Sequence, residues 1–317
     1  MSLTEQEPSV VPATSRSPVP QRTGDRIFSG LATGAGLAIL AALAGVAIFL
    51  VIKSWPAFTA DPKDLPGGQS VVDYIAPLAF GTLLSSLIAF VVAVPLAVAV
   101  ALYISYLAPR RIAEPLSYMV DLLAAIPSVV YGLWGIAVLG PAAVGIQTWL
   151  ADNAGFLPFF KGPASATGRT MLVVGLVLAV MILPIITAVT REVFSQTPPK
   201  LREGALALGA TRWEMIRMTV LPFGRSAIIS ASMLGLGRAL GETMAVTIIL
   251  SVSGAVTFNL ISSDNPSSIA ANIALNFPES SGVSVNLLIA SGLALFAITL
   301  IVNMAARALI GKNRVAV

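Results

Sequence analysis

The chain has 317 residues, of which 56% are hydrophobic and only 11% are charged. Soluble domains carry about 25% charged residues, so this composition indicates an integral membrane protein in contact with lipid. Cysteine and histidine are both absent, which excludes disulfides, thiolate or imidazole metal sites, and Ser-His or Cys-His catalysis. The net charge of +4 lies in short loops and tails, so we expect no nucleic-acid partner, no cofactor and no metal site.

The first 24 residues form a polar segment in which four prolines lie among serine, threonine and glutamine. Such a segment cannot bury enough apolar surface to fold, so a disordered cytoplasmic tail is predicted for residues 1–24. It does not resemble a signal peptide, because acidic residues precede any basic one and the apolar run begins too late.

Six apolar segments follow, each close to the ~20 residues that a helix needs to cross a bilayer. Pro95, Pro127 and Pro184 lie in the second, third and fourth segments, where we expect kinks or breaks. The sequence therefore predicts an all-α membrane protein with one six-span domain over residues 25–317. The predicted spans cover residues 28–52, 77–106, 117–140, 169–190, 226–251 and 286–309.

Lysine and arginine are unevenly distributed between the loops. If the N-terminus is inside the cell, fourteen of these residues lie on the cytoplasmic side, four lie on the other side, and only Arg238 lies within a span. Cytoplasmic loops are enriched in lysine and arginine, so we expect both termini in the cytoplasm. The predicted location is the plasma (inner) membrane.

The longest and most charged cytoplasmic connection covers residues 191–225. Thr197 followed by Pro198-Pro199 predicts the start of a helix, because proline at the first helical positions loses no hydrogen bond. Leu201, Ala205 and Leu208 then share one face of this helix.

The same connection contains a stop signal and a second start signal. Gly209 is expected to end the first helix, since glycine accepts the left-handed conformation that follows a last turn. Thr211 and Glu214 have the spacing of a capping box for a second helix, which we expect to run to Leu221. Two interpretations remain open for this protrusion: a solvated connector, or a docking element for a cytoplasmic subunit.

Permeases of ABC importers share a cytoplasmic motif of Glu-Ala-Ala, three residues, Gly, nine residues, Ile, one residue and Leu-Pro. This chain resembles the motif, with glycine for the second position and threonine for the isoleucine. The resemblance implies a coupling helix that fits a groove of an ATPase subunit, with a polar contact from Glu203 and a helix end at Gly209. The expected ATPase-docking residues are Leu201, Glu203, Gly204, Ala205, Leu208 and Gly209.

Arg238 and Glu242 lie within the fifth predicted span, one helical turn apart and on one face. From Ser226 to Arg238 a helix rises by about 18 Å, which places the charge near the middle of a ~30 Å hydrocarbon layer. Charges there are costly, so neither side chain is expected to face lipid. Two interpretations remain open: an ion pair that locks helix packing, or an anion pathway in which the guanidinium attracts phosphate-like oxygens.

Two stretches, GLGRALGETMAV at residues 235–246 and DLLAAIPSVVYGLWG at residues 121–135, resemble the PstC permeases of phosphate-specific ABC importers. The partner PstA permeases carry related but different forms of both. The similarity covers roughly residues 75–310, and it implies a permease of the six-helix ABC importer type that moves inorganic phosphate into the cytoplasm by alternating access. In that family, residues matching Arg238 and Glu242 are implicated in transport. The implied partners are two copies of an ATPase subunit, a PstA-like second permease and an extracytoplasmic phosphate-binding protein.

Three hydroxyl-bearing residues near these motifs are further candidates for the substrate pathway: Ser128, Tyr131 and Thr243. Hydroxyls can donate to oxyanions, but they also join membrane helices by hydrogen bonds. Asp121 is expected at the cytoplasmic membrane boundary.

The chain contains no G-x-x-x-x-G-K-[ST] sequence, so we expect a translocation subunit that does not itself hydrolyse ATP. Alternatives are a permease for another oxyanion or for an amino acid, a PstA-type permease, and a secondary transporter or channel. An intramembrane enzyme is disfavoured by the lack of histidine and cysteine.

Overall fold

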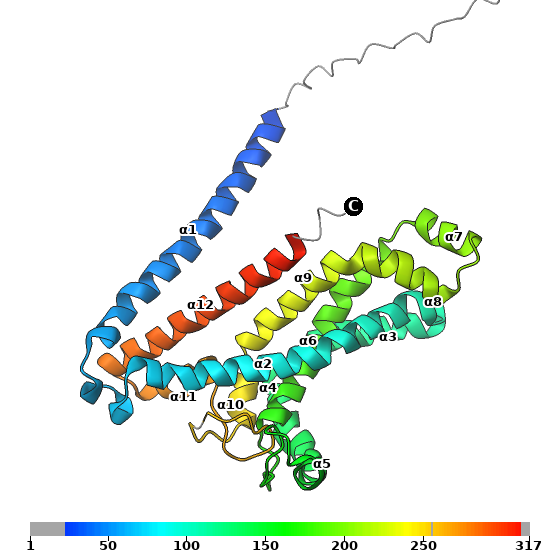
Figure 1. Ribbon diagram of the computed structural model, residues 1–317. Helices are drawn as coiled ribbons and strands as arrows, with labels where there is room; N and C mark the ends of the chain where they lie inside the picture. Colours follow the sequence, from blue (N-terminus) through cyan, green and yellow to red (C-terminus); the bar gives the residue numbers. More distant parts are fainter. Residues whose placement is uncertain (1–22, 255, 312–317) are drawn as a thin grey trace, which may run out of the picture. The chain divides into compact units, whose positions relative to one another are not determined.

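The computed structural model describes residues 23–254 and 256–311, and within this part the secondary structure is helical apart from one isolated β-bridge (Figure 1). The all-α prediction is therefore confirmed. Helix α1 (Thr23–Thr59) begins within the stretch predicted as a disordered tail. The rest of that predicted tail, residues 1–22, lies outside the described residues.

The described part contains six helical stretches long and apolar enough to cross a membrane, in agreement with the predicted number. Contacts divide the chain into two compact units, residues 1–49 and 50–317. In its described part the first unit is a single helix, the beginning of α1. The six stretches are Gly24–Thr59, Val71–Leu107, Ser128–Ala154, Met171–Ser195, Arg212–Leu240 and Val283–Ala308.

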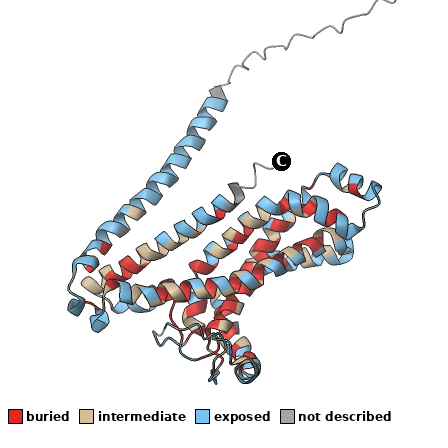
Figure 2. Cartoon of the chain, in the orientation of Figure 1, coloured by how far each residue is buried: buried red, intermediate tan, exposed pale blue. Residues whose placement is uncertain are grey.

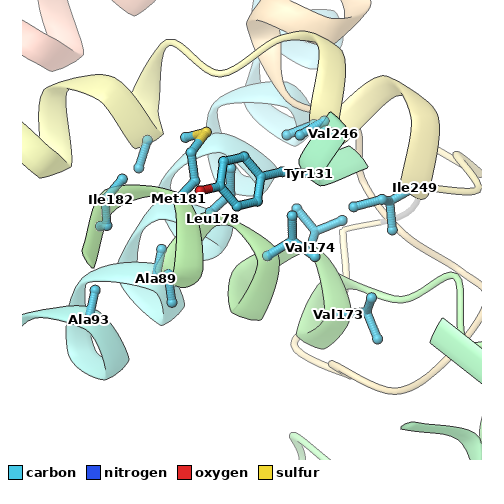
Figure 3. Packing of buried hydrophobic residues seen from close by; sticks show 14 of the residues in the cluster. Ala89, Ala93, Tyr131, Val173, Val174, Leu178, Met181, Ile182, Val246 and Ile249 are labelled. Carbon is cyan, nitrogen blue, oxygen red and sulfur yellow. The ribbon is translucent and has the colours of Figure 1, made fainter. Parts of the chain in front are cut away.

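The second unit is built around α6 (Met171–Ser195), which packs against α2 (Val71–Leu102) and α9 (Leu221–Leu240). From residue 171 to residue 189 helix α6 is apolar on all sides, as expected for a helix surrounded by others, and it carries many of the residues coloured as buried in Figure 2. Small residues on α2 at helical spacing, Ala89, Ala93 and Ala97, let the two backbones approach closely, and Figure 3 shows the first two near α6 side chains.

The third predicted span, 117–140, was placed wrongly. Residues 110–124 form a separate amphipathic helix, α3 (Arg110–Ala124), and the membrane-length stretch begins only at Ser128. Pro127 lacks an N–H group and disfavours helical geometry in the residue before it, which breaks the helix there. Beyond the break, α4 (Ser128–Trp134), a π-helical turn (Gly135–Leu139) and α5 (Gly140–Ala154) form one continuous stretch. By contrast, α2 and α6 stay helical on both sides of Pro95 and Pro184.

The fifth predicted span, 226–251, also differs from the structure. Helix α8 (Arg212–Met215) continues through a π-helical turn (Ile216–Val220) into α9, so the helix does not stop at Leu221. The wider turn accommodates Pro222, whose ring would clash with a regular α-helical turn. At its other end α9 stops at Leu240, and a short helix, α10 (Met244–Ile249), follows.

A long segment after α10 returns to the bundle through the buried amide of Asn265. Its Oδ1 atom accepts the N–H of Met171 at 3.1 Å, and its Nδ2 atom donates to the carbonyls of Arg169 at 3.1 Å and Ser251 at 3.3 Å. These bonds fix the segment to the start of α6. The remaining helices are α7 (Pro199–Ala207), α11 (Ile269–Asn276), α12 (Val283–Gly311), a π-helical turn after α2 (Tyr103–Leu107) and the 3-10 turns Pro62–Asp64, Pro66–Gly68 and Phe277–Glu279.

Candidate functional site

Arg238 and Glu242 do not share a face of one helix, because α9 ends between them. Gly241 follows the last helical residue, and the N–H of Glu242 donates to the carbonyl of Ala239 at 3.3 Å. The Glu242 carboxylate then accepts the N–H of Ala245 at 3.1 Å, at the beginning of α10. A carboxylate at this position accepts a hydrogen bond from a free amide, and its negative charge interacts favourably with the positive end of the helix dipole. Glu242 therefore links the two helices, and with an exposure of 8% it is buried.

The two charged side chains do not form an ion pair. Within residues 23–254 and 256–311 the one ion pair joins Arg191 to Asp121 at 3.3 Å. The interpretation of Arg238 and Glu242 as a locking pair is therefore not supported by the structure. Arg238 is exposed and lines a groove between α9 and α12.

Tyr131 is held at the break between α3 and α4. Its hydroxyl donates to the carbonyl of Leu123 at 2.8 Å. In an unbroken helix this carbonyl would accept from residue 127, but Pro127 has no N–H to give. The aromatic ring of Tyr131 lies in the core beside Leu178 and Met181 (Figure 3).

The other two hydroxyl candidates differ in their partners. Thr243 is half-buried and donates to the carbonyl of Gly241 at 3.2 Å. Ser128, also half-buried, is the first residue of α4, and among the described residues its hydroxyl forms no hydrogen bond. Tyr131 and Thr243 thus stabilise backbone at two helix breaks, while the Ser128 hydroxyl is available.

The fold brings the two sequence motifs together. Helix α4 packs against α10, and Gly132 allows the close approach: a Cβ atom added there would lie 3.0 Å from the Cα of Ala245 and 3.2 Å from the Cδ1 of Ile248. Arg238 lies in the last turn of α9, shortly before Glu242 and α10. Arg238, Tyr131 and the break at Glu242 therefore belong to one region of the molecule.

The connection after α6 folds largely as predicted. Helix α7 begins at Pro199, and Gly209 follows its end with a φ of +87°. The N–H groups of Gly209 and Ala210 donate to the carbonyls of Leu206 and Ala205, as in a Schellman motif. These predictions are confirmed.

The capping box is also present. The Glu214 carboxylate accepts the N–H of Thr211 at 2.8 Å, and the Thr211 hydroxyl accepts the N–H of Glu214 at 3.3 Å. Because α8 continues into α9, this capped end begins one helical stretch that reaches Leu240.

Ala205 does not belong to the exposed face of α7. It is 7% exposed and packs on the chain's own residues, among them Phe194 and Ile216, whereas Leu208 is 89% exposed. The prediction that both lie on a docking face is wrong for Ala205, because its small side chain lets α7 lie directly on the bundle. Leu201, Glu203, Gly204 and Gly209 are exposed, as a docking surface requires.

The sequence interpretation missed other exposed residues in this part of the chain. Trp213 of α8 is 59% exposed, and its large apolar surface signals an interaction site. The sequence interpretation treated the stretch from Thr211 to Glu214 only as a capping box, so Trp213 within it was not proposed as a docking residue. The exposed large apolar side chains of residues 191–225 are Leu201, Leu206, Leu208, Trp213, Met218 and Phe223.

Three residues that line the groove beside Arg238 were also missed: Ser230, Asn303 and Arg307. Arg307 was counted among the basic residues that orient the chain. Only the packing of α12 against α9 brings it to the same groove as Arg238.

Comparison with known proteins agrees with this arrangement. The family described as "Binding-protein-dependent transport system inner membrane component" matches residues 93–315. Phosphate transport system permease protein PstC 2 of Mycobacterium bovis is 46% identical over 304 residues, which covers 92% of this chain and 93% of the relative. PstC of Haemophilus influenzae is 40% identical over 290 residues, covering 87% and 90%.

A solved structure shares the fold. It is a bacterial ABC transporter involved in the import of the acidic polysaccharide alginate, with a TM-score of 0.58 and 16% identity, covering 91% of this chain and 99% of that chain. At this identity the likeness concerns the fold alone. The family match and the shared fold agree with the six membrane-length helical stretches of the described part. The chain therefore belongs to the family of binding-protein-dependent transport system inner membrane components and, within it, to the PstC permeases.

Proposed function

We propose that the chain is the membrane-spanning permease subunit of an ATP-driven importer that moves inorganic phosphate into the cytoplasm. The observation that carries this proposal is 40–46% identity, over most of the chain, to relatives named phosphate transport system permease proteins. The exposed guanidinium of Arg238 supplies suitable chemistry, since arginine offers a permanent charge and a planar set of donors for phosphate oxygens.

We assign different roles to the five pathway residues. Arg238 attracts the anion, and the Ser128 hydroxyl offers a further donor. Tyr131 and Thr243 stabilise the helix breaks beside the path, as their bonds to backbone carbonyls indicate. Glu242 holds α10 against the end of α9 through its bond to the Ala245 N–H.

The α7–α8 connection, meaning the part of residues 191–225 that includes α7 and α8, is the proposed docking surface for the ATPase subunit. The importer contains two copies of this subunit. Its apolar and polar candidates project away from the bundle: Leu201, Glu203, Gly204, Leu208, Gly209 and, newly, Trp213. The continuous helical stretch Arg212–Leu240 joins this surface to Arg238. A movement imposed by ATP-driven closure of the ATPase pair would thus reach the anion site through one stiff element, which suits alternating access.

The orientation follows from charge. Both termini and the α7–α8 connection lie in the cytoplasm of a cell with the chain in its plasma (inner) membrane, because lysine and arginine concentrate on that side. An extracytoplasmic phosphate-binding protein delivers the anion to the opposite side. Arg238 is exposed on this single chain, so a PstA-like second permease is proposed to complete the path beside it.

The test is reconstitution of the chain with its ATPase, its partner permease and its binding protein in vesicles. ATP-dependent accumulation of phosphate is expected, with little accumulation of sulfate. A guanidinium by itself does not distinguish oxyanions. Preferential uptake of sulfate would therefore show that the chain belongs to an ATP-driven importer whose substrate is sulfate and not phosphate. Phosphate flux that needs no ATPase would reject the importer in favour of a channel or a secondary transporter.

A further inference from the structure

A groove of about 490 Å³ runs between α9 and α12 and carries two arginines. Arg238 comes from α9 and Arg307 from α12, and both side chains are exposed. The described residues that line the groove include no carboxylate. The lining residues are Ser230, Met233, Leu234, Gly237, Arg238, Asn303, Ala306 and Arg307.

Helix geometry spreads the two charges along the groove. Ser230 and Arg238 are eight residues apart, which corresponds to about 12 Å along α9, while Asn303 and Arg307 lie one turn apart on one face of α12. The two helices run in opposite directions (Figure 1), so Arg307 lies toward the Ser230 end and Arg238 toward the other. The groove therefore carries one guanidinium toward each end.

The two positive charges are uncompensated. In the described part of the chain neither Arg238 nor Arg307 forms an ion pair. Like charges that line one groove destabilise each other, and an anion between them removes this repulsion. Gly237 leaves space beside Arg238, because an added Cβ atom would meet no described atom within 4 Å. The groove thus combines positive charge with room for a ligand.

The neutral donor of the groove is the Asn303 amide. The Ser230 hydroxyl already donates to the carbonyl of Ser226 at 2.9 Å, whereas the exposed Asn303 forms no hydrogen bond among the described residues. Two guanidiniums with one carboxamide form a donor set suited to the several oxygens of a tetrahedral oxyanion.

We propose that the groove between α9 and α12 binds a phosphate-type oxyanion between Arg238 and Arg307, with Asn303 as a further donor. The inference rests on the proposed function for Arg238 and adds Arg307 and Asn303 to the binding groups. The oxyanion is either free inorganic phosphate or the phosphate of a lipid headgroup, since both present the same oxygens to the guanidiniums.

A labelling experiment tests binding directly. The whole importer, purified in detergent, is treated with phenylglyoxal in chloride, in inorganic phosphate or with added phosphatidylglycerol, and mass spectrometry follows the modification of each arginine. Inorganic phosphate is expected to slow modification of Arg238 and Arg307 by about threefold or more relative to chloride at equal ionic strength. Arg111, exposed on α3 outside the groove, serves as the internal control and should not be protected.

A second experiment compares variants of the whole importer in vesicles of phosphatidylcholine with or without phosphatidylglycerol. Arg307→Gln is expected to lower the maximal rate of phosphate uptake by about tenfold, with Arg307→Lys retaining much of it. Asn303→Ala should show a smaller loss. Arg111→Gln is the matched control and should transport normally. Co-purification of the subunits shows whether each variant assembles.

The outcomes separate the sources and the hypotheses. Protection by inorganic phosphate, with the Arg307→Gln defect in both vesicles, identifies free phosphate as the ligand. Protection by phosphatidylglycerol alone, with a defect only in vesicles that contain it, identifies the lipid headgroup. If neither anion protects Arg307, the inference is overturned. If the wild-type importer accumulates no phosphate, the proposed function fails, while the labelling still decides whether the groove binds an oxyanion.

Discussion

Gly132 of α4 lies directly against Ala245 of α10, so that a Cβ atom on Gly132 would come within 3.0 Å of the Ala245 Cα. This contact joins two motifs that are more than a hundred residues apart in the chain. It places the helix that follows the break at Pro127 beside the helix that follows the break at Glu242. Discontinuous helices of this kind commonly form the substrate sites of transporters.

Replacing Gly132 by valine should separate α4 from α10. The new side chain meets backbone that cannot rotate away, so we expect a loss of about 1–3 kcal/mol, seen as a lower melting temperature of the purified protein. Gly145→Val is the matched control, because an added Cβ there meets no described atom within 4 Å. Equal effects of the two changes would show that the contact does not hold the helices.

Arg238→Met should lower phosphate uptake by about a hundredfold and leave assembly intact. Since Arg238 forms no ion pair among the described residues, removing its charge leaves no buried carboxylate without a partner. Uptake in vesicles and co-purification of the subunits measure the two effects. Arg238→Lys, which keeps the charge but loses the planar donors, should retain part of the activity. If the Arg238→Met variant no longer assembles with the other subunits, Arg238 has a structural role and not a role in attracting the anion.

Glu242 offers a test of its bond to the α10 amide. Glu242→Gln keeps an oxygen that can accept the Ala245 N–H, so its melting temperature should change little. Glu242→Ala loses this bond and should cost about 1 kcal/mol. If the two variants melt at the same lowered temperature, the negative charge of Glu242, and not its bond to Ala245, stabilises the break.

Leu208 is exposed and Ala205 is buried, so substitutions at these two positions test docking and folding separately. Leu208→Glu should leave the melting temperature unchanged and reduce retention of the ATPase subunit by about tenfold, because the side chain is 89% exposed. Ala205→Leu should instead destabilise the permease by about 1–3 kcal/mol, since it overpacks the contact with the bundle. Normal ATPase retention in Leu208→Glu would argue for a solvated connector.

Asn265→Ala should release the segment after α10 from the start of α6. The variant leaves three backbone groups without their partner, and we expect a loss of about 3 kcal/mol in the melting curve. Asn153→Ala is the control, because its amide donates only to an exposed carbonyl of its own helix. A melting temperature equal to that of the control would show that the segment is held by other contacts.

Much of the secondary structure near helix ends could be predicted from the sequence. The start at Pro199, the turn at Gly209 and the capping box of Thr211 each depend on residues within a few positions of one another. The breaks were harder to place. Pro127 was recognised as the site of a kink or break, but a mid-span kink and a true break have the same local signal, and the end of α9 before Gly241 was not predicted.

The sequence by itself determined the membrane class, the number of spans and the family motifs, because hydropathy and capping depend on composition and on neighbours in the chain. Only the tertiary structure decided which side chains meet. It turned Ala205 inward and Leu208 outward, separated Arg238 from Glu242 at a helix end, and brought Arg307 into the groove of Arg238. The physical reason is that hydropathy and capping depend on residues close together in the chain, whereas the groove and the buried face arise from packing between distant segments.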